Sequence, residues 1–378
     1  MSIPILFDST DVGAPQITAN NSASVLAVLR ACLYGVGTSG IAYNGRASAG
    51  WTLAYEDIAN NKAVYRQPAG NQFYIRFGEP YVCNYPSSSA AARNTLQVRG
   101  FEAMSSIDVG TGMFPTNTTN PGYGNAINGS PGGASYWSWA TGTNTQSTNT
   151  QTIPWTIIVD DRFFYIRFMP AFGTASTNPT TAVYFFGDII PLRADDAFNT
   201  VIFVNSDTNQ GNNNTYGSPC FTADNGYAYQ PFATDPSITS MHVCRPVNQL
   251  GSAINKLFLH SPAHYIWTSA FGAGTDAAFG NQSPVSFPDP VDGAIALDSG
   301  TQVIENYLTA ATRCVRGYMP GLYTVPYARP YLDQTILSVP SGPYAGKQFY
   351  SMRNTRTGDL AGNDTFNVFF LINQDWRV

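Results

Sequence analysis

The pentapeptide Phe-Tyr-Ile-Arg-Phe (FYIRF) occupies residues 73–77 and occurs again at residues 164–168. In each copy, large apolar side chains alternate with side chains that carry a polar end. A period of two is typical of a β-strand with one face on a hydrophobic core and the other toward water. The repeat therefore predicts the same kind of strand twice, with Phe and Ile in the core.

The flanks of the two copies are also alike. A turn sequence precedes each copy, Pro-Ala-Gly-Asn at residues 68–71 and Asp-Asp at residues 160–161, which predicts strand, turn, strand. After each copy, a polar segment leads to a further strand-like run with a central glycine, Gly100 or Gly187. We expect a bulge or a close backbone approach at these glycines.

The predicted fold is mainly β, with two related antiparallel β units, a C-terminal β segment and two or three short helices. We expect residues 51–106 and 137–193 to superpose; similar strands without duplication are the alternative. Three parts are predicted: an N-terminal segment with a helix (1–50), the two β units joined by a long polar loop (51–200), and a C-terminal α+β region packed on the β units (201–378).

Two segments carry helix signals. Residues 21–35, NSASVLAVLRACLYG, offer Ser22 or Ser24 as a cap, an apolar stripe, and Gly35 as a stop. Residues 301–323, TQVIENYLTAATRCVRGYMPGLY, also look helical, and their glycines and proline are expected to end the helix or turn the chain. Short strands are predicted beyond them, up to an apolar final strand.

Composition narrows the classes of function. Hydrophobic residues make up 43% of the chain, enough for a sizeable core, whereas charged residues make up only 11%, well below the usual share of about 25%. A surface of amides, hydroxyls and glycines suits a subunit buried among neighbours. The 19 basic residues are scattered and the net charge is −5, which argues against nucleic acid as a partner. No apolar run is long enough to span a membrane, and the N-terminus lacks the features of a secretory signal.

Cysteines and histidines do not form a metal-binding pattern. The two histidines of His-Ser-Pro-Ala-His, His260 and His264, are separated by Pro262, which disfavours a regular helix that would align them. Five cysteines lie far apart, without a CxxC pair: Cys32, Cys83, Cys220, Cys244 and Cys314. Buried free thiols are therefore expected rather than a disulfide framework or a zinc site.

No catalytic constellation stands out either. Neighbouring carboxylates at residues 160–161 and 195–196 are the nearest approach to an acid and base pair. Adjacent residues of a strand point to opposite faces, however, and a turn is the commoner place for Asp-Asp. We predict no enzyme activity, no cofactor and no metal site.

The longest tract of low charge, residues 106–152, is the candidate contact region. It carries Tyr136, Trp137 and Trp139 as possible interface or glycan contacts, since aromatic side chains pack at subunit interfaces and stack on sugar rings. An ordered arm that covers a neighbour and a flexible solvent loop remain the two alternatives for the tract.

Several stretches resemble a group of virion proteins from the late gene clusters of tailed bacteriophages. The similar stretches are FDSTDVGAPQIT (7–18), ACLYG (31–35), AGWTLAYEDIANNKAVYRQPAGNQFYIRF (49–77), VRGFEAMSSIDVGTGMFP (98–115), VDDRFFYIRF (159–168), YFFGDIIPL (184–192), VRGYMPGLY (315–323) and Asp-Trp-Arg (375–377). They cover core, turn and glycine positions along nearly the whole chain, so the resemblance implies no catalytic residues.

The resemblance implies a structural component of the virion, assembled in the host cytoplasm, without fixing its place in the particle. We expect it at the neck, tail or baseplate. The expected partners are copies of the chain itself, as a homo-oligomer, and other virion proteins, with the Tyr and Arg of FYIRF facing a neighbouring copy. A capsid decoration or head-surface protein is one alternative. A receptor- or glycan-binding module is an alternative of a different class.

Overall fold

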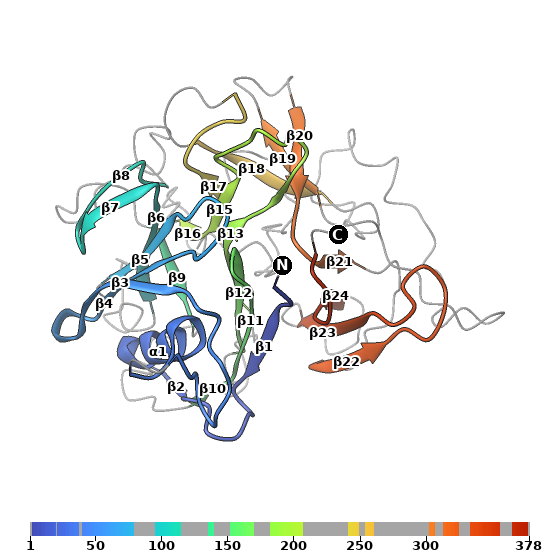
Figure 1. The fold of residues 1–378 in the computed structure, drawn as a ribbon, viewed down its shortest axis with the longest axis horizontal. Coiled ribbons are helices and arrows are strands. Elements are labelled where there is room, and N and C mark those ends of the chain that lie inside the picture. Colours follow the sequence, from blue (N-terminus) through green and yellow to red (C-terminus); the bar gives the residue numbers. More distant parts are fainter. Residues whose placement is uncertain are drawn as a thin grey trace, which may run out of the picture.

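The computed structural model describes thirteen segments of the chain: residues 2–19, 21–37, 40–78, 95–114, 135–139, 152–169, 182–206, 241–248, 254–260, 302–306, 313–324, 333–355 and 365–376. This part is mainly β, as predicted, and its named strands pair in an antiparallel manner (Figure 1). The regular structure consists of three larger sheets, two small two-stranded sheets and one short α-helix within these segments.

The first FYIRF copy lies in a six-stranded sheet. Its strands are, in spatial order, β16 (Asn205–Ser206), β9 (Ser135–Ser138), β6 (Thr95–Phe101), β5 (Tyr74–Gly78), β4 (Lys62–Arg66) and β3 (Thr52–Asp57). A hairpin of β7 (Ala103–Ser106) and β8 (Val109–Thr111) follows β6 directly. The hairpin covers a small apolar cluster on the outer face of this sheet, which includes Val64 and Met104.

The second copy lies in a ten-stranded sheet. Its strands are, in spatial order, β1 (Ile5–Asp8), β11 (Trp155–Val159), β12 (Phe163–Phe168), β13 (Ala182–Asp188), β15 (Thr200–Phe203), β17 (Met241–Val243), β18 (Ile254–His260), β19 (Gln302–Asn306), β20 (Arg313–Tyr318) and β14 (Ile190–Pro191). Only Ile189 separates β13 from β14. The pairing of β14 with β20 therefore brings the far end of the sheet back to β13.

The C-terminal part forms a separate four-stranded sheet. Its strands are, in spatial order, β21 (Leu322–Thr324), β24 (Thr365–Leu371), β23 (Gln348–Thr355) and β22 (Thr335–Ser338). A small sheet of β2 (Ile17–Thr18) and β10 (Thr152–Ile153) joins the N-terminal segment to the residues just before β11. The predicted C-terminal β segment is thus present.

The three larger sheets are stacked as layers, with the ten-stranded sheet in the middle of Figure 1 and the six-stranded and four-stranded sheets on either side. Phe, Ile and Phe of both FYIRF copies enter one core between the six-stranded and ten-stranded sheets. Tyr165, on the opposite face of β12, enters a second core that the four-stranded sheet covers. Strand β12 is consequently buried along its whole length, which is typical of a strand with both faces covered.

The first helix signal is confirmed, with a different cap. Helix α1 (Ser22–Leu29) has Asn21 at its N-cap instead of Ser22 or Ser24. It continues into a π-helical turn, η1 (Arg30–Tyr34), and Gly35 ends it at a φ of 114°. A single 3₁₀ turn, η2 (Ile58–Asn60), is the other helical element in the described segments.

The second helix signal was wrong. Residues 302–306, 313–318 and 322–324 form the strands β19, β20 and β21 instead of a helix. Strand β19 pairs with β18 on one side and β20 on the other, and both Val303 and Glu305 are fully buried. Pairing with two neighbours inside the sheet overrides the local apolar spacing.

The two β units share their local strand order, β4-β5-β6 and β11-β12-β13. Both glycines lie at a close approach, as expected: an added Cβ would lie 2.3 Å from the Phe114 ring at Gly100 and 2.1 Å from the Cβ of Phe163 at Gly187. Their registers differ, because Gly100 is opposite Ile75 whereas Gly187 is opposite Phe163, the residue before the motif. The superposition of the two units stays a prediction.

Candidate functional site

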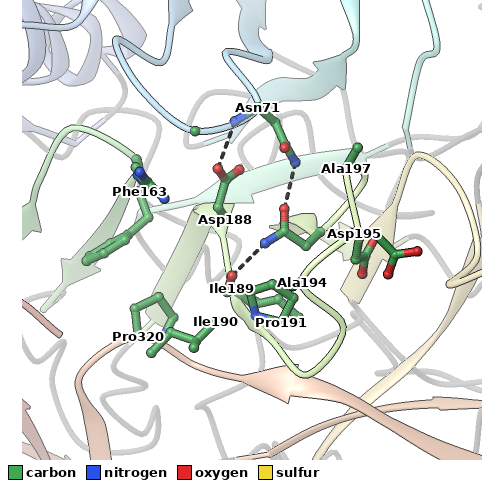
Figure 2. A pocket seen from close by; sticks show the side chains of 14 residues that line it. Asn71, Phe163, Asp188, Ile189, Ile190, Pro191, Ala194, Asp195, Ala197 and Pro320 are labelled. Atoms are coloured by element: carbon green, nitrogen blue, oxygen red, sulfur yellow. Dashed lines mark hydrogen bonds between the residues drawn. The ribbon is translucent and has the colours of Figure 1, made fainter. Parts of the chain in front are cut away.

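A pocket of about 350 Å³ lies where the turns of different layers meet. The β4–β5 turn contributes Gly70 and Asn71, and the β11–β12 turn contributes Arg162. The connection from β13 to β15, with Asp188 at its start, and Pro320 of the β20–β21 turn complete it (Figure 2). Because polar and charged side chains gather there, we take this pocket as the candidate functional site.

Asp188 is the central polar residue of the pocket and is only 6% exposed. Its carboxylate accepts hydrogen bonds from Thr200 Oγ1 at 2.6 Å, the Asn71 backbone N–H at 2.9 Å and Gln67 Nε2 at 3.1 Å. Burial raises the pKa of the Asp188 carboxyl above its ordinary value, and these hydrogen bonds oppose that shift. The residue joins the β4–β5 turn to the end of β13 in the ten-stranded sheet.

The conformation of the β4–β5 turn permits this junction. Gly70 has a φ of +71°, and an added Cβ would lie 1.9 Å from Asp188 Oδ2, so glycine meets both the backbone and the space requirement. Gln67 closes the turn, since its backbone N–H donates to the Phe73 carbonyl at 3.1 Å and its side-chain oxygen accepts from the Phe73 N–H at 2.9 Å. The turn is also held to the β11–β12 turn, because the Ala69 N–H donates to the Asp161 carbonyl at 3.1 Å.

A chain of amide hydrogen bonds crosses the pocket floor (Figure 2). Asn71 Nδ2 donates to Asn199 Oδ1 at 2.7 Å and to Thr200 Oγ1 at 2.9 Å. Asn199 Nδ2 in turn donates to the Ile189 carbonyl at 2.7 Å. The orientation of both amides is therefore fixed by their partners.

Arg162 is the cation of the pocket. The side chain is half-buried, its Nε is enclosed, and within the described segments its guanidinium makes no hydrogen bond. Its positive charge lowers the pKa of Asp188, against the larger effect of burial. Arg162 therefore lines the pocket with donors that no described residue uses.

The paired carboxylates noted in the sequence do not form an acid and base pair. Asp160 closes the β11–β12 turn, because its Oδ1 accepts from the backbone N–H groups of Arg162 at 2.7 Å and Phe163 at 3.0 Å; the turn prediction is confirmed there. Asp195 is exposed and pairs with Arg193 at 2.6 Å, while its neighbour Asp196 is buried. The two members of each pair thus have different roles.

Asp196 belongs to a buried ionic cluster near the pairing of β14 with β20 in the ten-stranded sheet. Arg316 pairs with Asp196 at 2.8 Å and with Glu305 at 3.0 Å, and all three side chains are 0% exposed. The guanidinium also donates to the carbonyls of Arg245 at 2.8 Å and Phe198 at 2.6 Å. Burial raises the pKa of Glu305 and Arg316 opposes that rise. Because these charges are compensated within the chain, we read the cluster as structural.

The polar side chains of FYIRF contact this chain itself, contrary to the expectation that they face a neighbouring copy. Arg76 pairs with Asp108 in the β7–β8 turn, and its Nε donates to the Ile107 carbonyl at 2.8 Å. Arg167 pairs with Asp333, and Tyr165 donates to the Pro320 carbonyl at 3.0 Å. Each motif therefore holds a covering element on the outer face of its sheet.

Trp137 and Trp139 are each 1% exposed, so the prediction that they display a contact surface was wrong. Trp137 lies between the two sheets, with its ring centroid 5.1 Å from Phe77 and 4.9 Å from Tyr184. Its Nε1 donates to the Phe203 carbonyl at 2.7 Å. Alternation along β9 explains why both indoles point into the core.

The other contact candidates fall largely outside the described residues. These are the side chain of Tyr136 and, within the tract proposed as an arm, residues 115–134 and 140–151. The choice between an ordered arm and a solvent loop therefore stays a prediction.

The thiols and imidazoles that the structure describes are structural. Cys32 and Cys244 are buried and free, as predicted, and Cys314 is half-buried and free, whereas Cys83 and Cys220 lie outside the described residues. His242 is buried, and this burial lowers its pKa to about 3. His264 and the side chain of His260 also lie outside the described residues.

The described segments show neither a cluster of metal ligands nor a membrane-spanning helix. They contain no group of three or more His, Cys, Asp or Glu side chains that could hold a metal ion. They also contain no helix with the length and apolar character needed to cross a bilayer.

Comparison with known proteins does not assign the site, since no family model matches the chain and no curated protein matches it. Sequence reasoning noted the two turns at residues 68–71 and 160–161 but missed the pocket between them. It also missed Asp188, Asn71 and Arg162 as a group. The turn sequences were the available signal, and nothing in the linear order shows that they meet in space.

Proposed function

We propose that this chain is a non-enzymatic structural subunit of a tailed-bacteriophage particle, placed at the neck, tail or baseplate. One observation supports the proposal most: many of the stretches that resemble phage virion proteins lie in the strands of the stacked sheets. They hold all or most residues of β2 to β8, β12 to β14, β20 and β21. Many of the resembling stretches thus lie in the packed sheets of the protein.

The hydrogen bonds and ion pairs between the layers support the role of a rigid subunit. Trp51, just before β3, donates from Nε1 to the Asp160 carbonyl in the neighbouring sheet at 2.7 Å. Arg245 pairs with Glu102 at 2.8 Å, and Arg167 pairs with Asp333 at 2.7 Å, so each side sheet is fastened to the central one by an ion pair. A unit held in this way transmits force between its faces without rearranging.

The proposed partners are further copies of the chain and other virion proteins. With only 11% charged residues, a surface of this chain loses little charge hydration when a neighbour covers it. Amide and hydroxyl groups can exchange water for hydrogen bonds to the partner, at a net gain of about 1 kcal/mol each. A closed ring or trimer would use one such surface repeatedly.

Electron microscopy of purified particles tests the proposal directly. We expect density for the chain in several symmetry-related copies at the neck, tail or baseplate, with the three stacked sheets recognisable in each. Particles from which the chain is absent would refute the proposal. Density confined to the head surface would correct the location.

A further inference from the structure

The pocket at Asp188 contains polar groups whose hydrogen-bonding capacity is not filled within the described segments. Arg162 has a free guanidinium within the described segments, as noted above. The side-chain oxygen of Asn71 accepts no hydrogen bond there, although its Nδ2 donates two. Within the same segments, Asp188 Oδ2 accepts a hydrogen bond only from the Asn71 N–H and has capacity for a further donor. Free donors and free acceptors therefore face the same space.

The opposite side of the pocket is apolar. Phe163, Ile190, Pro191 and Pro320 line it, and Figure 2 shows Ile190, Pro191 and Pro320 gathered on the side away from Asn71. Phe163 is held in place by stacking on Trp376, with ring centroids 4.5 Å apart. At about 350 Å³, the volume is at the lower end of the range of about 300–1,000 Å³ for small-molecule sites.

We propose that this pocket binds a neutral polyhydroxylated ligand of about monosaccharide size. Arg162 donates hydrogen bonds to its hydroxyl oxygens, and Asp188 and Asn71 accept hydrogen bonds from its hydroxyl groups. The apolar side chains contact the C–H face of the ligand. A sugar ring combines these two characters, since its hydroxyls both donate and accept while its ring carbons are apolar.

The charges of the pocket favour a neutral ligand. An anion that pairs with Arg162 would lie close to the Asp188 carboxylate, and a cation that pairs with Asp188 would lie close to Arg162; each meets repulsion. A hydroxyl group satisfies both residues without carrying a charge. This inference does not depend on the proposed place in a phage particle, because it is tested on the isolated chain and either can fail alone.

Saturation-transfer NMR and titration calorimetry on the purified full chain test the inference, with glucose, galactose, mannose and N-acetylglucosamine as probes. We expect saturable binding of at least one of these sugars. Arg162→Gln should weaken it about tenfold or more, as for the loss of hydrogen bonds from a charged donor. Ala194→Trp, at an exposed position on the pocket rim, should abolish binding by filling the pocket.

Two matched variants control for folding. Arg30→Gln removes an arginine and Ala103→Trp adds an indole at an exposed position, and neither residue lines the pocket; both should bind as the wild type does. The inference is overturned if none of the four sugars binds, or if Arg162→Gln and Ala194→Trp bind them unchanged. Two results in place of sugar binding would overturn the neutral class. One is saturable binding of inorganic phosphate that is lost in Arg162→Gln, and the other is saturable binding of guanidinium that is kept or strengthened in Arg162→Gln.

Discussion

Arg167 and Asp333 form a two-pronged ion pair between the central sheet and the C-terminal sheet, with N–O distances of 2.8 and 2.7 Å. Arg167 is the fourth residue of the second FYIRF copy. The fourth residue of the first copy, Arg76, likewise pairs with an aspartate in a turn, Asp108. The two copies of the pentapeptide therefore have the same structural role. Their apolar side chains fill a shared core, and the arginine of each copy holds an element over the outer face of its sheet.

Loss of the Arg167 pair should weaken the attachment of the four-stranded sheet. Arg167 is 2% exposed and Asp333 is 33% exposed, so Arg167→Met leaves an aspartate that water can still reach. We expect the free energy of unfolding, from urea titration, to fall by about 2 kcal/mol, below the value for a fully buried pair.

The exposed pair of Arg193 and Asp195 provides the control for that measurement. Its side chains are 51% and 69% exposed, and Arg193→Met should leave the free energy of unfolding unchanged within error, because such pairs contribute little. Equal effects of the two substitutions would contradict a role for Arg167 in joining the layers.

The two core tryptophans should respond differently to loss of the indole N–H. Trp137 Nε1 donates to the Phe203 carbonyl at 2.7 Å, whereas Trp139 Nε1 makes no hydrogen bond within the described segments. Trp137→Phe removes the hydrogen bond from the indole to the Phe203 carbonyl, so it should cost about 1 kcal/mol more than Trp139→Phe. Thermal and urea unfolding measure the difference. Equal costs would show that the hydrogen bond from Trp137 to Phe203 contributes nothing to stability.

The repeated pentapeptide shows which features of the fold could be predicted from the sequence and which could not. Alternation in FYIRF predicted strands with Phe and Ile in a core, and the structure places them there. The same alternation could not reveal that a second core covers Tyr165, because the covering strands lie more than a hundred residues later. A polar end on a side chain was read as exposure, although a buried arginine with a partner produces the same pattern.

The sequence did not predict strand β19 or the pocket, and the physical reason is the same. Val303 and Glu305 are both fully buried in β19. The carboxylate is acceptable there because Arg316 lies 3.0 Å away and the Val247 N–H donates to it at 3.1 Å. In the pocket, Asn71 and Asp188 are far apart in sequence and meet through one backbone N–H. Such contacts depend on how the layers stack, which local propensity does not encode.

Buried His242 should make the protein less stable as the pH falls. Its pKa is lowered from 6.5 to about 3 in the folded chain, so below about pH 6.5 the unfolded chain binds a proton that the folded chain does not. Stability is therefore present above the unfolded value and lost as the pH falls toward the folded one, at about 1.4 kcal/mol per pH unit.

Urea unfolding at about pH 6 and pH 5 checks this slope. His242→Gln removes the titrating group, so its free energy of unfolding should change less between the two pH values than that of the wild type, by about 1.4 kcal/mol. Identical changes in the two proteins would show that the imidazole of His242 binds its proton equally well in both states.

Substitution of Gly70, the glycine of the β4–β5 turn, should be costly for two reasons, and comparison with Gly45 in another turn separates them. Gly70 and Gly45 have similar φ values of +71° and +76°, but an added Cβ meets Asp188 Oδ2 at 1.9 Å in the first and nothing within 4 Å in the second. Gly45→Ala should cost about 1 kcal/mol from backbone strain alone. Gly70→Ala carries the same strain and also displaces the Asp188 carboxylate from Asn71 and Thr200, so it should cost about 1–3 kcal/mol more. Unfolding titrations of both variants give the difference; if Gly70→Ala costs no more than Gly45→Ala, Asp188 does not hold the turn to the sheet.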